Sequence, residues 1–264
     1  MKRVSLEDNN YLNVEVIGNL DLPKIIFSNS LGSDLRMWDP QVKAMKDKFC
    51  IIRYDKRGHG KSSPAKGPYS FDMLENDVIK IMDDLNVEKA NFVGLSMGGM
   101  TSLGLALKHQ NRFNKFVCCA ARADMPPPLQ EGWNQRIAIV NENDTKGVVN
   151  GSLERWFSEE FSKNPDNSDI INLSKDMITN TSKDGYIGSC EAIKKLDYLK
   201  DLSTINKDIL YISGEKDMGA PAMAMEEMHH ITPNSKYECI SGAAHILNLE
   251  CAEKVSNTIL EFLN

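Results

Sequence analysis

A serine between two glycines is the first feature of this chain that suggests chemistry. Residues 91–100 read NFVGLSMGGM, so Gly94 and Gly98 stand two places before and after Ser96. An apolar run ends at this turn and a segment with helical apolar spacing follows it, which predicts a strand, a sharp turn and a helix. The turn would present the serine hydroxyl beside the first N–H groups of the helix. The pattern predicts a nucleophile beside an anion-binding pocket; the alternative is a serine that only caps the helix.

A serine hydroxyl needs a base at neutral pH, and His245 is the predicted base. The sequence contains five histidines. We expect surface positions for His109, His229 and His230, which lie in or at the end of helical segments, and a packing or hydrogen-bonding role for His59 in a glycine turn. His245 follows the last predicted strand, and the carboxyl ends of parallel strands share one edge of a sheet. It is therefore expected beside the serine.

The base in turn needs an acidic group that holds its tautomer and stabilises its cation, and Asp217 is the first candidate. It lies in SGEKDMG, in the loop after the penultimate predicted strand, and thus at the same edge of the sheet. The turn residues Gly214 and Gly219 are expected to expose it. Asp124, one strand earlier, and Glu215 in the same loop remain alternatives.

A repeating pattern of strands and helices must position these residues. Strand-like runs are expected over 24–30, 49–54, 91–95, 116–121, 208–213 and 235–241, helices over 38–46, 71–85, 101–109, 222–230 and 249–262, and an antiparallel hairpin over 2–18. In the helix over 71–85 one face carries Leu74, Val78, Ile81, Met82 and Leu85. Alternating strands and helices predict an α/β fold with a mostly parallel central sheet, helices on both faces and right-handed crossovers.

A helical insertion interrupts this alternation. The prolines at 126–128 continue neither a helix nor a central strand, and the chain from there to about residue 200 is helix-prone without a strand-like run. We therefore predict an α/β core made of residues 1–122 and 201–264, with residues 123–200 as a helical cap over the sheet.

Composition and charge exclude several classes of protein. The chain has 264 residues and a net charge of −6 without a dense basic stripe, which argues against a nucleic-acid partner. No apolar run approaches the roughly 20 residues of a membrane span, so no membrane partner is expected. The amino terminus has no apolar segment of the signal-peptide type, which predicts a cytoplasmic protein. Six cysteines without a C-x-x-C pair or metal-ligand spacing are expected to be reduced and mostly buried.

The chain order serine, acid, histidine is that of the α/β-hydrolase fold, and the sequence resembles this family over its whole length. Within the family it is similar to the 3-oxoadipate enol-lactonases of the β-ketoadipate pathway of aromatic catabolism. The resemblance rests on SNSLGSDLRMWDPQ (28–41), RYDKRGHGKSS (53–63), GLSMGGM (94–100), the run Arg155, Trp156 and Phe157, and GAAHILNLE (242–250). Most of the superfamily has a His-Gly pair at the end of the strand expected over 24–30. This chain has Asn29 and Ser30 there, which is similar to the enol-lactonase pattern.

The resemblance implies a serine hydrolase that opens the enol-lactone of 3-oxoadipate and needs neither a metal nor an organic cofactor. It implies that Ser96, Asp217 and His245 form the catalytic triad. It also implies that the backbone N–H groups of Leu31 and Met97 form the oxyanion hole.

The substrate implied by the resemblance carries a carboxylate, which a mostly apolar pocket holds only with a cation. Arg136, one helical turn from Trp133, is the first candidate, with Arg155 and Arg122 as alternatives. Trp133 and Trp156 are expected to line the same pocket. The expected partner is thus a small anionic lactone or ester, and a homo-oligomer is left open. A general carboxylesterase, a carbon–carbon bond hydrolase of the same fold and a catalytically inactive ligand-binding receptor remain alternatives.

Overall fold

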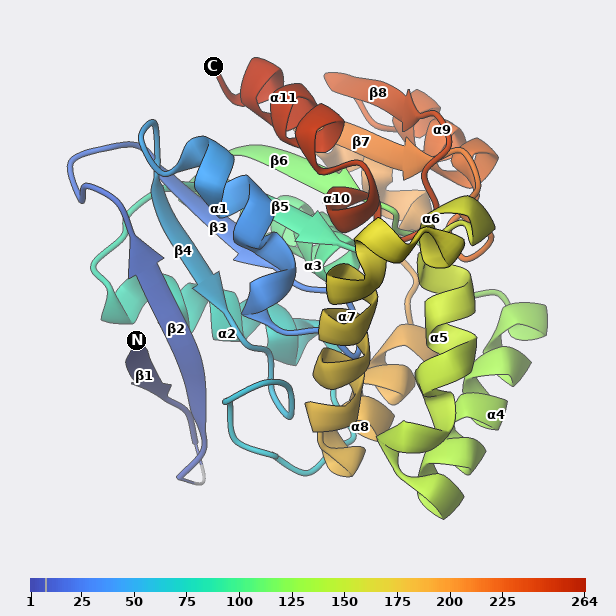
Figure 1. Cartoon of the computed structure of the whole chain (residues 1–264). Helices are drawn as coiled ribbons and strands as arrows, with labels where there is room; N and C mark the ends of the chain where they lie inside the picture. Colours follow the sequence, from blue (N-terminus) through green and yellow to red (C-terminus); the bar gives the residue numbers. More distant parts are fainter. Residues whose placement is uncertain (8) are drawn as a thin grey trace.

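A mixed sheet forms the centre of the computed structural model, which describes residues 1–7 and 9–264 (Figure 1). In these residues the sheet has eight strands in the order β1-β2-β4-β3-β5-β6-β7-β8. The strands are β1 (Lys2–Ser5), β2 (Tyr11–Ile17), β3 (Lys24–Ser28), β4 (Cys50–Tyr54), β5 (Ala90–Leu95), β6 (Phe113–Cys119), β7 (Asp208–Gly214) and β8 (Ser235–Ile240). β2 is antiparallel to β1 and to β4, and the other neighbours are parallel. The mostly parallel sheet and the amino-terminal hairpin are confirmed; Asp8, within that hairpin, lies outside the described residues.

Helices cover both faces of the sheet (Figure 1). The helices are α1 (Asp39–Met45), α2 (Phe71–Asp84), α3 (Met97–Lys108), α4 (Pro127–Asn143), α5 (Val149–Trp156), α6 (Glu159–Lys163), α7 (Ser168–Asn180), α8 (Lys183–Lys194), α9 (Ala222–Ile231), α10 (Leu247–Glu250) and α11 (Ala252–Leu263). Short 3-10 turns are η1 (Leu35–Trp38), η2 (Gln110–Arg112), η3 (Thr145–Val148), η4 (Pro165–Asn167) and η5 (Leu199–Thr204). α1 and α11 lie side by side on one face, α2 and α3 pack together on the other, and α9 packs on β7 and β8.

The predicted helices form where their sequence patterns place them, with two differences in their limits. Ser70 caps the start of α2, because its hydroxyl accepts a hydrogen bond from the N–H of Met73. The predicted apolar face of α2 is buried or packed against the core. The helix after the serine begins at Met97 rather than Thr101, because the glycine pair already forms its first turn. The last predicted helix is divided at Cys251, whose φ of −123° and ψ of 50° are not helical.

The helical insertion, α4 to α8, leaves the sheet after β6 and returns at β7 (Figure 1). Its two ends run antiparallel beside each other through a bridge between Asp124 and Asp197. There the N–H of Met125 donates to the carbonyl of Leu196. The division into core and cap at residues 122/123 and 200/201 stays a prediction.

Helix α8 lies directly against the loop that follows β4. A Cβ at Gly58, which has a φ of 70°, would overlap the Cα of Gly185. The N–H and the hydroxyl of Ser182 both donate to the carbonyl of Gly58, at 2.8 and 2.9 Å. Backbone therefore touches backbone at this junction, with no room for a side chain on either glycine.

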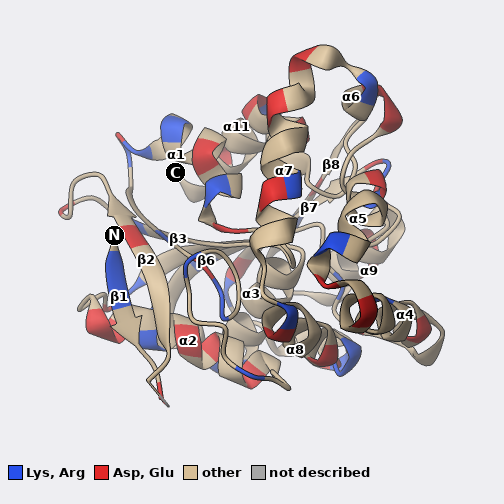
Figure 2. Cartoon of the chain, turned by 60° about the horizontal axis from the view of Figure 1, so that its bottom comes forward, with Lys and Arg blue, Asp and Glu red and all other residues tan. Residues whose placement is uncertain are grey.

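Charge is mixed over the outer helices. Acidic and basic residues both occur on α1, α2, α7 and α8 (Figure 2). In the described part of the chain, no helix has both the length and the apolar character needed to cross a membrane. Most of the thiols are buried, as predicted; Cys251 is half-buried and Cys239 is exposed.

Candidate active site

Ser96 occupies the tight turn between β5 and α3. Its backbone has φ 57° and ψ −114°, a conformation that non-glycine residues adopt rarely and that is characteristic of strained functional turns. A Cβ at Gly94 would overlap the carbonyl of Gly98, and a Cβ at Gly98 would overlap the carbonyl of Ser28. The predicted strand, turn and helix are confirmed, and the two glycines are required because backbone segments touch at both places.

The structure brings the three predicted triad side chains together in one hydrogen-bonded chain. The Nε2 atom of His245 lies 2.8 Å from the Oγ atom of Ser96, and its Nδ1 atom lies 2.7 Å from the Oδ2 atom of Asp217. Because a carboxylate only accepts, Nδ1 carries the proton and Nε2 is free to accept the hydroxyl proton of the serine. This is the arrangement that general-base activation of a hydroxyl requires.

Asp217 is held by backbone donors as well as by the histidine. Its Oδ1 atom accepts hydrogen bonds from the N–H groups of Gly219 and Ala220, at 2.8 and 3.1 Å, which leaves Oδ2 for the histidine. The expectation that Gly214 and Gly219 expose this carboxylate is wrong, because the side chain is fully buried. Gly214 instead makes room for the neighbouring loop, since a Cβ there would overlap the carbonyl of Ala244.

The alternative acids lie elsewhere. Asp124 pairs with Arg122, with Nη2 and Oδ1 3.3 Å apart. Glu215 accepts from the N–H of Gly242 and from the hydroxyl of Ser241 on the exposed side of the loop. Neither contacts the histidine, so the geometry selects Asp217.

Glu250 supports the loop that carries the histidine, a role that its position in the sequence does not predict. Its Oε2 atom accepts the N–H of Ala244 at 2.7 Å, and its Oε1 atom accepts the N–H of Ser158 at 3.0 Å. One carboxylate thus joins the loop before His245 to the helical insertion. In the sequence, Glu250 is only an acidic residue five positions after the histidine. Its two hydrogen-bond partners become apparent only in the folded structure.

His59 is completely buried and hydrogen-bonded through both ring nitrogens. Its Nδ1 atom lies 2.8 Å from the carbonyl of Arg57, so Nδ1 carries the proton, and Nε2 accepts the N–H of Gly32 at 3.1 Å. Burial, with a smaller contribution from Lys56, lowers the pKa of His59 to about 3. The hydrogen-bonding role expected for this residue is confirmed.

Leu31 lines the same cavity as Ser96, and Met97 follows the serine in the chain. Leu31 comes three residues after the end of β3 and Met97 is the first residue of α3. Both residues are buried, and within residues 1–7 and 9–264 neither backbone N–H donates to a protein acceptor. Buried N–H groups without a partner are rare, and a pair beside a nucleophile is suited to receive a developing oxyanion.

A cavity of about 390 Å³ opens above the serine and the histidine. Trp133 and Trp156 line it, as do Arg122, Arg136 and Arg155, and its described lining contains no carboxylate. The guanidinium carbon of Arg136 lies 4.2 Å from the centre of the Trp133 ring. The predicted substrate-binding residues therefore share one cavity with Ser96 and His245.

The arginines of this cavity differ in how they are neutralised. Arg122 pairs with Asp124. Among the described residues, no carboxylate pairs with Arg136 or Arg155, and Arg155 donates only to the hydroxyl of Ser152, at 3.3 Å. Burial and the nearby Arg136 lower the pKa of Arg155. Two cations without a counter-charge in one cavity are suited to an anionic ligand.

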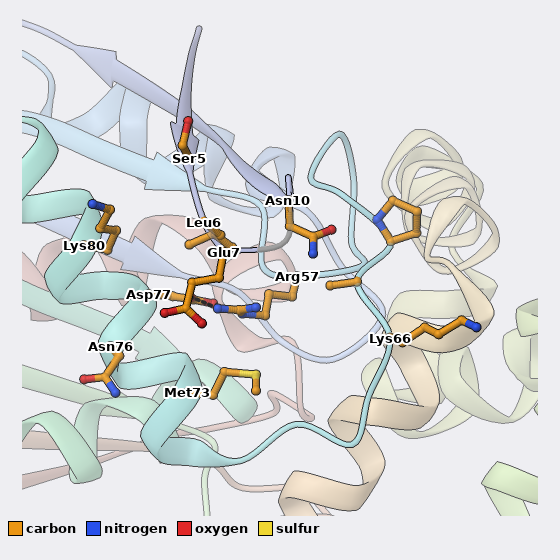
Figure 3. Close-up of a pocket in the computed structure, with 12 residues that line it drawn as sticks. Ser5, Leu6, Glu7, Asn10, Arg57, Lys66, Met73, Asn76, Asp77 and Lys80 are labelled. Atoms are coloured by element: carbon orange, nitrogen blue, oxygen red, sulfur yellow. Dashed lines mark hydrogen bonds and ion pairs between the residues drawn. The ribbon is translucent and has the colours of Figure 1, made fainter.

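A larger cavity of about 1190 Å³ lies between the amino-terminal hairpin, the loop after β4 and α2 (Figure 3). Arg57 reaches across it to Asp77, and both of their hydrogen bonds measure 2.6 Å. Burial raises the pKa of Asp77 to about 6, although Arg57 opposes this. Its described lining contains no histidine and no cysteine.

Known proteins resemble this chain along most of its length. The family described as the alpha/beta hydrolase fold matches residues 23–252. 3-Oxoadipate enol-lactonase 1 of Acinetobacter baylyi is 35% identical over 243 residues, covering 92% of this chain and 89% of that protein. The crystal structure of the enol-lactonase from Burkholderia xenovorans LB400 is 34% identical, with a TM-score of 0.92 and 97% of each chain covered. A putative carbamate hydrolase of Caulobacter segnis is 25% identical over 241 residues, with 90% of each chain covered. The fold and the resemblance predicted from the motifs are confirmed.

Proposed function

Because this chain belongs to the α/β-hydrolase family and is an enol-lactonase-like hydrolase of ester or lactone bonds, we propose that it opens the enol-lactone of 3-oxoadipate to give 3-oxoadipate. The observation that carries the proposal is the continuous hydrogen-bonded chain from Asp217 through His245 to Ser96, at the floor of a cavity with two unpaired arginines. The proposed reaction belongs to the β-ketoadipate pathway of aromatic catabolism.

The first step is attack by the serine on the lactone carbonyl. The Nε2 atom of His245 takes the hydroxyl proton as Oγ bonds to the carbonyl carbon, and the buried carboxylate of Asp217 stabilises the resulting imidazolium. Collapse of the tetrahedral intermediate breaks the ring C–O bond and expels an enolate, which is protonated by the imidazolium or by water and relaxes to the ketone. Water then hydrolyses the acyl-enzyme with the same base, which regenerates the serine.

The negative charge of the tetrahedral intermediate needs donors in place before the reaction. We assign this role to the N–H groups of Leu31 and Met97, which have no protein acceptor in the described chain. Loss of one such donor costs about 2.7–4 kcal/mol of transition-state stabilisation in a related chemistry. Since an enolate is a good leaving group, the demand for acid catalysis at the ring oxygen is modest.

The free carboxylate of the lactone is assigned to Arg136, with Arg155 as the second donor. Both guanidinium groups line the cavity of the triad, and neither pairs with a described carboxylate. A hydrogen bond between charged partners contributes about 1.5–3 kcal/mol, which corresponds to roughly 10- to 150-fold in binding. Trp133 supports the Arg136 guanidinium through its ring face.

Steady-state hydrolysis of the enol-lactone, followed by the loss of ultraviolet absorbance of the conjugated ring, tests the proposal. The variant Ser96→Ala should lose activity by several orders of magnitude while remaining folded. The variant Arg136→Met should raise KM for the lactone about 10- to 100-fold and leave KM for a neutral nitrophenyl ester unchanged. Arg3→Met, at an exposed arginine on β1, is the matched control and should change neither value.

Two results would redirect the proposal. Equal rates in wild type and Ser96→Ala would reject serine catalysis altogether. A neutral ester that is hydrolysed with a higher kcat/KM than the lactone would instead identify a general carboxylesterase. Hydrolysis of a carbon–carbon bond in a diketone, absent in Ser96→Ala, would identify the other reaction class of this fold.

A further inference from the structure

The loop 55–63, DKRGHGKSS, has no part in the proposed chemistry, yet it holds an unusual side chain. Lys56 is 1% exposed, and within the described residues its amine pairs with no carboxylate. Lysines are almost never fully buried unless they are paired. The amine instead donates to two consecutive backbone carbonyls, those of Asn29 at 2.6 Å and of Ser30 at 2.9 Å. A buried amine that binds two backbone carbonyls is suited to fix the orientation of the peptide groups of Asn29 and Ser30.

The planarity of the Ser30–Leu31 peptide fixes the direction of the Leu31 N–H. The carbonyl of Ser30 and the N–H of Leu31 belong to the same planar trans peptide and point in opposite directions. Ser30 and Leu31 line the catalytic cavity, whereas Lys56 is not part of its lining. The amine of Lys56 binds the carbonyl of Ser30 on the side away from the cavity. The N–H of Leu31 therefore points away from Lys56 and toward the cavity.

The neighbouring N–H groups of this loop are all used inside the protein. The N–H of Ser30 donates to the Sδ atom of Met37, that of Gly32 to Nε2 of His59, and that of Ser33 to the carbonyl of Ser30. In the part of the chain that the structure describes, only Leu31 in the run 30–33 has an N–H without an acceptor. The loop is thus arranged to leave one donor unused.

The loop that carries Lys56 is itself anchored to the core. Its neighbour Arg57 forms two hydrogen bonds with Asp77 of α2 (Figure 3). Asp55 accepts the N–H of Leu35 at 2.8 Å and the N–H of Lys61 at 2.9 Å. The amine therefore extends from a rigid support, which a positioning role requires.

We propose that Lys56 is a positioning residue that orients the Ser30–Leu31 peptide, so that the N–H of Leu31 is held in place as an oxyanion donor. This inference rests on the proposed function only in taking Ser96 as the nucleophile. The hydroxyl of Ser33 also donates to the carbonyl of Ser30, at 2.9 Å. Lys56 therefore shares the carbonyl of Ser30 with Ser33, and it also donates to the carbonyl of Asn29.

The positioning role does not depend on the charge of the amine. Burial lowers the pKa of Lys56 to about 7, against the opposing effect of Asp55 and Asp34. The protonated amine has three N–H bonds and the neutral amine has two, which still suffice for two carbonyls.

The test compares Lys56→Met with Lys61→Met, an exposed lysine of the same loop. The substrates are a nitrophenyl ester and the enol-lactone, and a boronic acid that forms a tetrahedral adduct with Ser96 serves as transition-state analogue. For Lys56→Met we expect a 10- to 100-fold lower kcat, a KM within about twofold of wild type, and a matching loss of affinity for the boronic acid. Lys61→Met should behave as wild type. If Lys56→Met does not fold, Lys56→Gln, which keeps N–H donors on a shorter side chain, should show a smaller parallel loss.

The outcomes separate this inference from the proposed substrate. If Lys56→Met only lowers the melting temperature, with kcat and boronic acid affinity unchanged, the positioning role is refuted. If the lactone is not hydrolysed but the ester is, in a manner that requires Ser96, the substrate is wrong and the ester data decide the role of Lys56. If no substrate shows hydrolysis that depends on Ser96, both proposals fall together.

Discussion

Replacing His59 by glutamine should make the protein less sensitive to acid. The imidazole is completely buried and neutral, accepts the N–H of Gly32 and donates to the carbonyl of Arg57. Glutamine has an amide oxygen that accepts and an N–H that donates, so His59→Gln can keep both hydrogen bonds without a titrating group. The substitution therefore removes the titration of residue 59 while it keeps the hydrogen bonds of the side chain.

The magnitude follows from the pKa values of the two states. Burial lowers the pKa of His59 from 6.5 to about 3, so between these values the unfolded chain binds a proton that the folded chain does not. This contribution to stability is complete above pH 6.5 and is lost as the pH falls toward 3. At pH 5, about 1.5 pH units below 6.5, the loss is about 2 kcal/mol at roughly 1.4 kcal/mol per unit.

Urea unfolding followed by tryptophan fluorescence, at pH 7.5 and pH 5, measures this difference. Wild type should lose about 2 kcal/mol more unfolding free energy between the two pH values than His59→Gln, because all other titrating groups are common to both proteins. His230→Gln is the matched control, since its exposed side chain meets solvent in the folded chain too. An equal loss in wild type and His59→Gln would refute the assignment of a neutral buried imidazole.

Three further perturbations test the site and its support. Asp217→Asn keeps the shape of the carboxylate but cannot stabilise the imidazolium, so kcat should fall about 10³- to 10⁴-fold with little change in KM; a normal kcat would contradict its role. Gly98→Ala should destabilise by about 1–3 kcal/mol or more, whereas Gly132→Ala, in open space within α4, should stabilise by about 0.5–1 kcal/mol in thermal unfolding. Equal shifts would reject the close approach at Gly98. Glu250→Gln leaves one of two backbone N–H groups without an acceptor and should lower the unfolding free energy by about 1–2 kcal/mol, which an unchanged urea midpoint would disprove.

Local patterns in the sequence were enough to predict the sheet and the turn at Ser96. Alternating apolar runs and helical periodicity depend on neighbouring residues, and the glycines two places from the serine are required by a close contact within one turn. His245 and Asp217 were also predictable, because topology alone brings the carboxyl ends of parallel strands to one edge. The wrong expectation concerned exposure: the Asp217 carboxylate is buried, where it accepts hydrogen bonds from the N–H groups of Gly219 and Ala220 and from His245.

The residues that support the site were not predictable in the same way. Lys56 and His59 read as members of a polar loop, and their burial depends on how that loop packs behind the loop after β3. Glu250 binds two N–H groups that are 86 residues apart along the chain. Such contacts join distant segments through single hydrogen bonds, and they leave no periodicity in the sequence.

The glycine junction between Gly58 and Gly185 restricts how a ligand reaches the serine. A movement of α8 away from the core would break both hydrogen bonds from Ser182 to the carbonyl of Gly58. It would also separate Gly185 from Gly58, in the loop that carries Lys56. The lining of the catalytic cavity reaches solvent elsewhere, at Leu129 and Met218, two apolar side chains that are exposed. We therefore expect substitutions at Leu129 or Met218 to change access to the cavity without moving Ser96 or His245.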